Sequence, residues 1–291
     1  METYFYNRRT GKEERELVLG DAMLKLAYGS AVGRVLAWPM LCTSVFSRLM
    51  GCYANSGLSK GRIAKTIAEL NIDMNDYVIP EGGFTCFNDF FTRKVKEDAR
   101  PFATEGLCSP ADCRLTVYPH LEEGTCIPVK GRSFTMKELL GKPGEEYADG
   151  FNGGSLAIFR LCPVDYHRYH YPDNGRTLAN WRMRGAYHSV NPIAIMQQIR
   201  VFTHNVREVS ILELEHYGTC AFIEVGAFGV ATIRQTHESD TFRRGDEKGY
   251  FAFGGSTIIM VFQKGKLTFD NDLTKHLPME TLVHAGEHIA N

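Results

Sequence analysis

The sequence predicts an α+β fold, in which a helical N-terminal part packs on a mainly antiparallel β domain. The 291 residues change character near Arg100-Pro101. Before that point apolar residues recur at the three- and four-residue spacing of amphipathic helices, whereas after it short apolar runs alternate with glycine and proline. We therefore expect two parts, 1–99 and 100–291, with one boundary between them.

Three apolar patterns predict the helices of the first part. Residues 13–50 place Leu17 and Leu24 on one helix face and continue into a strongly apolar run around Trp38. Residues 59–70 form a shorter helix with its own apolar stripe. Thr85 is the expected N-cap of a third helix, whose phenylalanines repeat at helical spacing and dock it on the core. These are Phe87, Phe90 and Phe91.

The apolar run before residue 50 has two interpretations. It is uncharged between Arg34 and Arg48, but Pro39 interrupts it, and spanning a bilayer needs about 20 apolar residues. The run either packs on the main domain or lies on a membrane surface, with basic side chains close to the lipid phosphates. Those side chains are Arg34, Arg48, Lys60 and Arg62.

The β-rich part is predicted from runs of β-branched and aromatic residues between turn signals. A helix over about 192–203 interrupts the strands. The expected strands are 114–118, 155–161, 207–214, 219–225, 228–235 and 257–262.

Composition excludes several classes of protein. Lysine and arginine number 33 against 34 aspartates and glutamates, so no global field favours nucleic acid as a partner. Eight cysteines at irregular spacings do not make a disulfide scaffold, and we expect a reducing compartment. The N-terminus lacks the basic region and apolar core of a signal peptide.

Ser256 is the residue around which the chemistry is organised. It follows Gly254 and Gly255 and enters a run of β-branched and aromatic residues. The segment is either an ordinary glycine turn before a core strand or a self-cleavage site. In the second case the hydroxyl attacks the carbonyl of Gly255, and the resulting ester is eliminated to dehydroalanine and hydrolysed to an N-terminal pyruvoyl group. A nucleophile elbow needs a second glycine where Ile258 stands, and no phosphate-loop Lys-Ser/Thr pair follows.

Three further residues are candidates for proton transfer, each with a structural alternative. Asp112 lies in a turn-like entry to a strand, where aspartate often bonds nearby backbone N–H groups. His167 and His170 lie among tyrosines and an arginine, and histidine is suited to proton transfer near neutral pH. Alone, each histidine is better explained as a hydrogen-bonded structural residue.

No metal site is expected. The spacing of His167 and His170 lacks the glutamate of the zinc helix motif, and Cys108 and Cys113 are not spaced like a zinc knuckle. His284 and His288 can share a helix face, but a solvated C-terminal tail explains them better.

Taken together, the motifs resemble the phosphatidylserine decarboxylase family. Each is weak alone, but they occur in family order over about residues 58–265. One position departs from the usual pattern, because Cys113 stands where glycine commonly follows the motif aspartate. The motifs are Phe84-Thr85-x-Phe87-x-Asp89-Phe90-Phe91-x-Arg93, Arg100-Pro101, Ser109-Pro110-Ala111-Asp112, Asp165-Tyr166-His167-Arg168-x-His170-x-Pro172, Ser189-Val190-Asn191, Val225-Gly226-Ala227 and Gly245-x-Glu247-x-Gly249-x-Phe251-x-Phe253-Gly254-Gly255-Ser256-Thr257.

The resemblance implies a proenzyme that cleaves itself between Gly255 and Ser256. The β chain would be residues 1–255 and the α chain 256–291, with a pyruvoyl group derived from Ser256 at its start. The family pattern assigns Asp112, His170 and Ser256 to a charge-relay trio for this step. His170 would take the hydroxyl proton, and Asp112 would fix the tautomer of the imidazole.

The resemblance also implies the reaction of the mature enzyme. The pyruvoyl carbonyl forms a Schiff base with the amine of phosphatidylserine and accepts the electrons released with carbon dioxide, giving phosphatidylethanolamine. His167 is the candidate for reprotonating Cα. Arg182, Arg184 and Arg207 are candidates for contacting the phosphodiester, although each is equally explained as surface charge.

The expected partners are the lipid substrate in a membrane and the protein's own α and β chains. We expect a peripheral enzyme on the cytoplasmic face of the cell membrane, without nucleic acid; the sequence leaves a homodimer open. Three alternatives remain at this point. They are a pyruvoyl-dependent decarboxylase of a soluble amino acid, an uncleaved hydrolase using Asp112, His170 and Ser256, and a lipid-binding protein that does not process.

Overall fold

The structure is a computed structural model that describes residues 3–16, 44–122, 134–186, 201–227, 232–253 and 256–291. The sequence predictions for 17–43, and for most of 192–203, lie outside these residues. No helix in the described ranges is long and apolar enough to cross a membrane.

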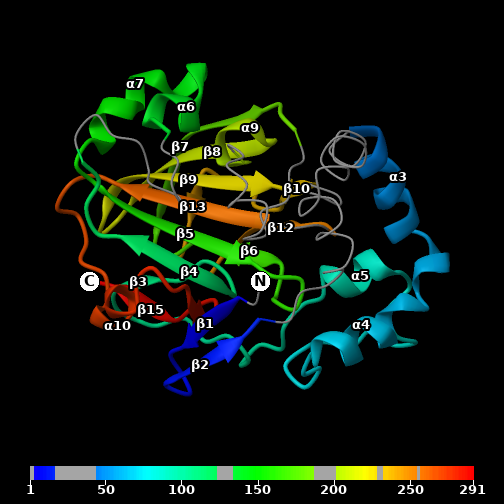
Figure 1. Ribbon diagram of the computed structural model, residues 1–291. Coiled ribbons are helices and arrows are strands. Elements are labelled where there is room, and N and C mark those ends of the chain that lie inside the picture. The colour runs from blue at the N-terminus through cyan, green and yellow to red at the C-terminus, as the bar shows by residue number, and fades with distance from the viewer. Residues whose placement is uncertain (1–2, 17–43, 123–133, 187–200, 228–231, 254–255) are drawn as a thin grey trace, which may run out of the picture.

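A ten-stranded sheet forms the centre of the molecule (Figure 1). Its order is β11-β7-β8-β9-β13-β5-β4-β14-β1-β2, and all neighbours are antiparallel except β1 and β14. The strands are β1 (Tyr4–Asn7), β2 (Lys12–Arg15), β4 (Cys113–Tyr118), β5 (Ser155–Leu161), β7 (Gly175–Met183), β8 (Arg207–Leu214), β9 (Gly218–Gly226), β11 (Thr241–Phe242), β13 (Ser256–Phe262) and β14 (Thr281–Val283).

Two smaller sheets complete the β structure. The order β10-β12-β6 joins β10 (Ile233–Gln235), β12 (Glu247–Phe251) and β6 (Arg168–His170), and a pair joins β15 (His288–Ala290) to β3 (Leu107–Cys108). Tyr169 of β6 and Phe251 of β12 share one buried cluster with Phe222 and Met260 of the large sheet. The hydrophobic core therefore fills the space between the two sheets.

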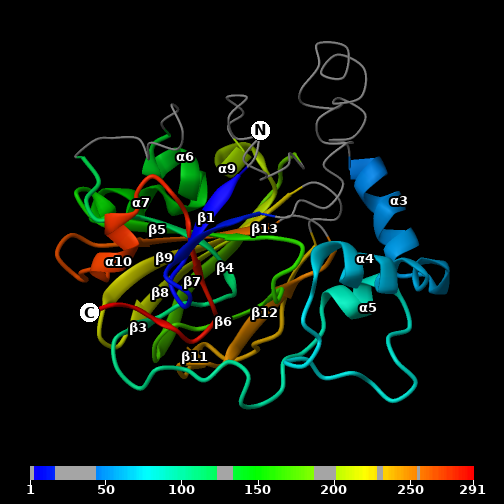
Figure 2. The ribbon, with the colours of Figure 1, turned by 60° about the horizontal axis from the view of Figure 1, so that its bottom comes forward.

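The other face of the large sheet is covered by short helices (Figure 2). Leu139 and Leu140 pack there with Ile223 and Val261 of the central strands. The elements around this face are α6 (Met136–Leu140), η3 (Lys142–Gly144), α7 (Glu145–Ala148), η4 (Asp149–Phe151) and α9 (Val201–His204), and α10 (Asn271–Lys275) lies near the C-terminus.

The N-terminal helices have a core of their own beside the sheets. They are α3 (Ser44–Ala54), η2 (Gly57–Ser59), α4 (Arg62–Leu70) and α5 (Phe87–Phe91). The three phenylalanines of α5 are buried in this cluster together with Tyr166, and Phe253 packs against it. Helix α5 thereby lies against the loop before β6 and the segment before β13.

The α+β fold is confirmed, and several details differ from prediction. Residues 13–15, predicted helical, lie in β2, which pairs with β1 at one edge of the large sheet. The N-cap of α5 is Cys86, whose sulfur accepts the N–H of Asp89, whereas Thr85 bonds the carboxylate of Asp89. Strands β5 and β8 coincide with their predicted ranges, and β4, β9 and β13 do so within one residue at an end. The described part of the predicted strand 228–235 is the short β10.

Candidate active site

Ser256 is the first residue of β13, the strand between β5 and β9. Its register partners are Leu161 and Gly226, so the hydroxyl lies at one end of three adjacent strands. The residue is fully buried. Because β13 is apolar on both faces and hydrogen-bonded on both edges, Ser256 is held at a rigid position.

His167 lies next to this hydroxyl. The two atoms, Ser256 Oγ and His167 Nδ1, are 3.4 Å apart. The imidazole stacks on the ring of Phe91 at a centroid distance of 3.9 Å, and its backbone carbonyl accepts the N–H of Phe251. Helix α5 and strand β12 therefore fix the ring from two directions.

The electrostatic environment keeps His167 neutral. Complete burial, reinforced by the positive charge of Arg93, lowers its pKa to about 3. Its Nε2 atom is buried and has no hydrogen-bond partner among the described residues, and the same holds for the hydroxyl of Thr257. In the tautomer that carries its proton on Nε2, the neutral imidazole can accept the hydroxyl proton of Ser256 at Nδ1.

His170 lies in a different environment. Its Nδ1 bonds the carbonyl of Gly245 at 2.9 Å, and its Nε2 is 3.2 Å from the hydroxyl of Tyr166. Burial lowers its pKa. Both nitrogens are thus occupied by groups other than Ser256 and Asp112.

Asp112 is almost fully buried at the entry to β4, and its carboxylate is saturated. The guanidinium of Arg100 binds it through two nitrogens, at 2.9 and 2.8 Å, and the N–H of Ala285 donates to Oδ1. Burial alone would raise the pKa of this carboxyl, but the bonds from Arg100 and the nearby His284 more than offset it, so the pKa is lowered. Asp112 is therefore charged at neutral pH and ties residue 100 to the C-terminal segment.

The structure brings together two of the four predicted site residues, Ser256 and His167. His170 and Asp112 lie near the site but bond other groups, so their predicted membership of a relay stays a prediction. Sequence reasoning missed the Arg100 partner of Asp112, although Arg100-Pro101 is one of the quoted motifs. It also missed the Phe91–His167 stack, since Phe91 was assigned only to the core.

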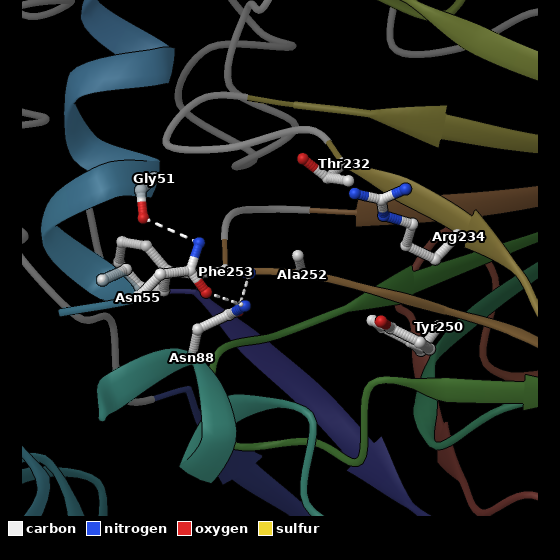
Figure 3. A pocket seen from close by; sticks show the side chains of 9 residues that line it. Gly51, Asn55, Asn88, Thr232, Arg234, Tyr250, Ala252 and Phe253 are labelled. Carbon is white, nitrogen blue, oxygen red and sulfur yellow. Dashed lines mark hydrogen bonds between the residues drawn. The ribbon is translucent and has the colours of Figure 1, made fainter. Parts of the chain in front are cut away.

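A chain of hydrogen bonds between amide groups connects the N-terminal helices to the segment before Ser256 (Figure 3). The N–H of Phe253 donates to the side chain of Asn88, which donates to Asn55, which in turn donates to the carbonyl of Gly51. The Phe253 ring meets Phe91 edge-on at 5.3 Å. Helices α3 and α5 thus position the approach to the predicted cleavage site.

The three arginines proposed as phosphodiester contacts lie elsewhere. Arg207 is buried, and its nitrogens donate to the carbonyls of four residues, while burial lowers its pKa to about 10. Arg182 and Arg184 are exposed at the end of β7, and Arg182 faces Glu208 across the ladder. Among the described residues, no three histidine, cysteine or acidic side chains converge as a metal site would require.

Comparison with known proteins gives a consistent result. The sequence profile of the family described as phosphatidylserine decarboxylase matches residues 87–291. A phosphatidylserine decarboxylase proenzyme of Clostridium botulinum is 40% identical over 292 residues, covering 99% of this chain and 98% of the relative. A proenzyme of the same name from Clostridium novyi is 39% identical, covering 98% of this chain and 97% of the relative. Another from Clostridium perfringens is 38% identical, covering 98% of each. This chain belongs to the phosphatidylserine decarboxylase family.

Proposed function

We propose that this chain is a proenzyme that cleaves itself before Ser256 and then decarboxylates phosphatidylserine to phosphatidylethanolamine. The observation that carries the proposal is the buried contact between Ser256 and the neutral His167. It supplies a nucleophile and a proton acceptor at the position where the sequence predicts self-cleavage.

The self-cleavage needs only groups of this chain and water. The hydroxyl oxygen of Ser256 bonds to the carbonyl carbon of Gly255 as His167 takes the hydroxyl proton. The peptide nitrogen leaves as the amine of residue 256, protonated by the same imidazole, so that an ester replaces the amide. Loss of the Cα proton and departure of the Gly255 carboxylate leave dehydroalanine, which water converts to a pyruvoyl end with release of ammonia.

The surroundings of Ser256 fit such a group. His167 Nε2 is a buried polar atom without a partner among the described residues, in the ring whose other nitrogen faces Ser256, and it is available to a bound substrate. A pyruvoyl group at position 256 would supply a ketone that takes up the electrons of the departing carboxylate. His167 would hold a proton for return to the substrate's Cα, and Phe91 would keep that imidazole in place and exclude water.

We also propose that the N-terminal helices hold the enzyme on the cytoplasmic surface of a membrane. Leu49 and Tyr53 are exposed on the same face of α3, and Leu58, 85% exposed, follows in η2. Lys60 and Arg62 are exposed beside them. An apolar face flanked by basic residues suits an interface of anionic lipid. All described cysteines are free thiols, which fits a reducing compartment.

The membrane proposal is tested by flotation with vesicles containing phosphatidylserine. The double variant Leu49→Asp, Leu58→Asp is expected to lose most of its binding, because both aspartates would have to enter the interface. Leu178→Asp is the matched control, since Leu178 is an exposed leucine on β7 of the large sheet. Equal flotation of all three proteins would overturn this assignment.

The catalytic proposal is tested with phosphatidylserine labelled at the serine carboxyl. Purified protein is expected to release labelled carbon dioxide and to form phosphatidylethanolamine in equal amounts, whereas Ser256→Ala is expected to do neither. Release from a soluble amino acid but not from the lipid would establish the rival decarboxylase. Ester hydrolysis by an uncleaved chain would establish the rival hydrolase.

A further inference from the structure

A pocket of about 180 Å³ lies between the three-stranded sheet and the N-terminal helices (Figure 3). The helical part contributes Gly51 and Ala54 of α3, Asn55 directly after it, and Asn88 of α5 to its lining. Phe253, three residues before Ser256, forms another part of the wall. The pocket thus adjoins both the proposed membrane-facing helix and the segment that leads to the cleavage site.

The floor of the pocket is one face of the β10–β12 ladder. Thr232, Arg234, Tyr250 and Ala252 line it. They share a face because Arg234 pairs with Tyr250, the N–H of Ala252 donates to the carbonyl of Thr232, and alternate residues of a strand point the same way. The intervening residues Ile233 and Phe251 are buried on the opposite face, in the core.

Among the described residues Arg234 has no counterion, and its neighbour Arg168 provides the contrast. Both pair with Tyr250, from opposite sides. Arg168 is neutralised by Glu247, with both carboxylate oxygens within 2.9 Å of one nitrogen. Arg234 is exposed, and in the described part of the chain no carboxylate lies within ion-pair distance of it. A free guanidinium beside hydroxyl and amide groups suits a phosphate oxygen, which it can bind through two N–H groups.

The pocket is close enough to the reacting groups to serve the same substrate. Strand β12 ends between two partners, since the N–H of Phe251 donates to the carbonyl of His167 and that of Ala252 donates to the carbonyl of Thr232. The backbones of His167 and Thr232 are therefore about 10 Å apart, which is two strand spacings. Phe253 lines the pocket and packs on Phe91, which stacks on His167. Phe253 therefore connects the pocket to the ring that holds His167 beside Ser256.

We propose that Arg234 binds the phosphodiester of the lipid substrate in this pocket and so sets the position of the serine headgroup. The inference rests on the proposed function, because it names a specificity-determining contact for that reaction. The same cation could instead attract anionic lipid in general, so the experiment must separate a bound headgroup from a charged surface.

The test uses dihexanoyl phosphatidylserine below its micelle concentration, so that no lipid surface is present. Arg234→Gln is expected to self-cleave as the parent does and to lower kcat/KM about 10- to 100-fold, mostly through KM. Arg234→Lys should recover only part of this loss. Lysine restores the positive charge, but its ammonium group cannot bind two phosphate oxygens side by side as the guanidinium can. The control is Arg176→Gln, an exposed arginine at the opposite end of β7 from the Ser256 end of the sheet.

Three results would decide against the proposal. An unchanged KM for Arg234→Gln with monomeric substrate would remove the phosphodiester contact. A loss seen with vesicles but not with monomers would assign Arg234 to general attraction of anionic lipid. An equal loss in Arg176→Gln would show a non-specific effect of charge. Failure of the parent itself to cleave or decarboxylate would instead overturn the proposed function.

Discussion

Two buried polar sites of this protein differ in how completely their hydrogen bonds are satisfied. The carboxylate of Asp112 accepts hydrogen bonds from the guanidinium of Arg100 and from the N–H of Ala285, and none from a histidine among the described residues. At Ser256, by contrast, the contact to His167 is long, and the other ring nitrogen has no partner among the described residues. Burial without partners is costly, so most proteins avoid it unless the group has a function.

The difference separates structural from chemical roles. A saturated ion pair such as Arg100–Asp112 holds separate segments together, and breaking it leaves the buried Arg100 with only the half-exposed Asp76 as a charge partner. An under-satisfied pair such as Ser256–His167 is free to form new bonds during a reaction. Three substitutions test this comparison, and they follow from the largest expected effect to the smallest.

Replacing the imidazole beside Ser256 should affect cleavage most. His167→Gln is expected to slow self-cleavage about 100-fold or more, the range for removing a general base, and to leave full-length protein. His170→Gln should have a smaller effect, because His170 bonds Gly245 and Tyr166. Intact mass against time measures both. If His170→Gln accumulates precursor while His167→Gln cleaves normally, the base is His170, as the family resemblance implies.

Replacing Asp112 should affect stability more than any surface ion pair does. In a Ser256→Ala background, which keeps one chain, Asp112→Asn is expected to lower the free energy of unfolding by up to about 3–5 kcal/mol, because Arg100 loses its buried charge partner and keeps only the half-exposed Asp76. The matched control is Glu213→Gln, which breaks the exposed pair with Arg176 and should cost at most about 1 kcal/mol. Urea denaturation measures both, and equal losses would contradict the structural role.

The same carboxyl predicts a dependence on pH. Because its pKa is lower in the folded protein than in the unfolded chain, ionised Asp112 stabilises the fold above its ordinary pKa of about 4. That stabilisation is lost as the pH falls through the lowered value. The stabilities of Asp112→Asn and its parent should therefore converge at acid pH, and a constant difference would count against this assignment.

Breaking the chain of hydrogen bonds that runs from α3 to Phe253 should have the smallest effect on self-cleavage. Asn88→Ala removes the acceptor for the Phe253 N–H and is expected to slow self-cleavage about 5- to 20-fold, since a half-buried donor that positions the cleavage segment is left unpaired. Asn55→Ala keeps that bond and breaks only the link to α3, so its effect should be smaller. Equal rates in Asn88→Ala and the parent would show that this bond does not position the cleavage segment.

Local sequence pattern predicted those parts of the fold whose signal is local. Strands β5 and β8 are apolar runs between turns, and their limits were predicted correctly. Strand β7 was missed because its residues alternate between half-buried and exposed and include arginines and asparagine. The pairing of strand β1 with β14 was not predicted because β14 lies at the other end of the chain and no local pattern encodes it, and the local hairpin of β1 with β2 was missed because residues 13–15 were assigned to a helix.

The site was predictable to the level of the motif but not of the atom. Ser256 at the head of a buried strand follows from the glycines and the apolar run. Which histidine faces it depends on how β12 meets the His167 loop, a long-range register that the shared motif does not specify. The pocket around Arg234 draws its lining from α3, α5, β10 and β12, so only the folded chain reveals it.

The central claim is that Ser256 is a nucleophile in self-cleavage, and intact mass spectrometry of the purified protein tests it most directly. We predict two fragments, residues 1–255 and 256–291, of which the smaller carries a pyruvoyl end. A Ser256→Ala variant is expected to stay whole. A single full-length species that persists through prolonged incubation would contradict the account, because no carbonyl group would then exist to take up the electrons of decarboxylation.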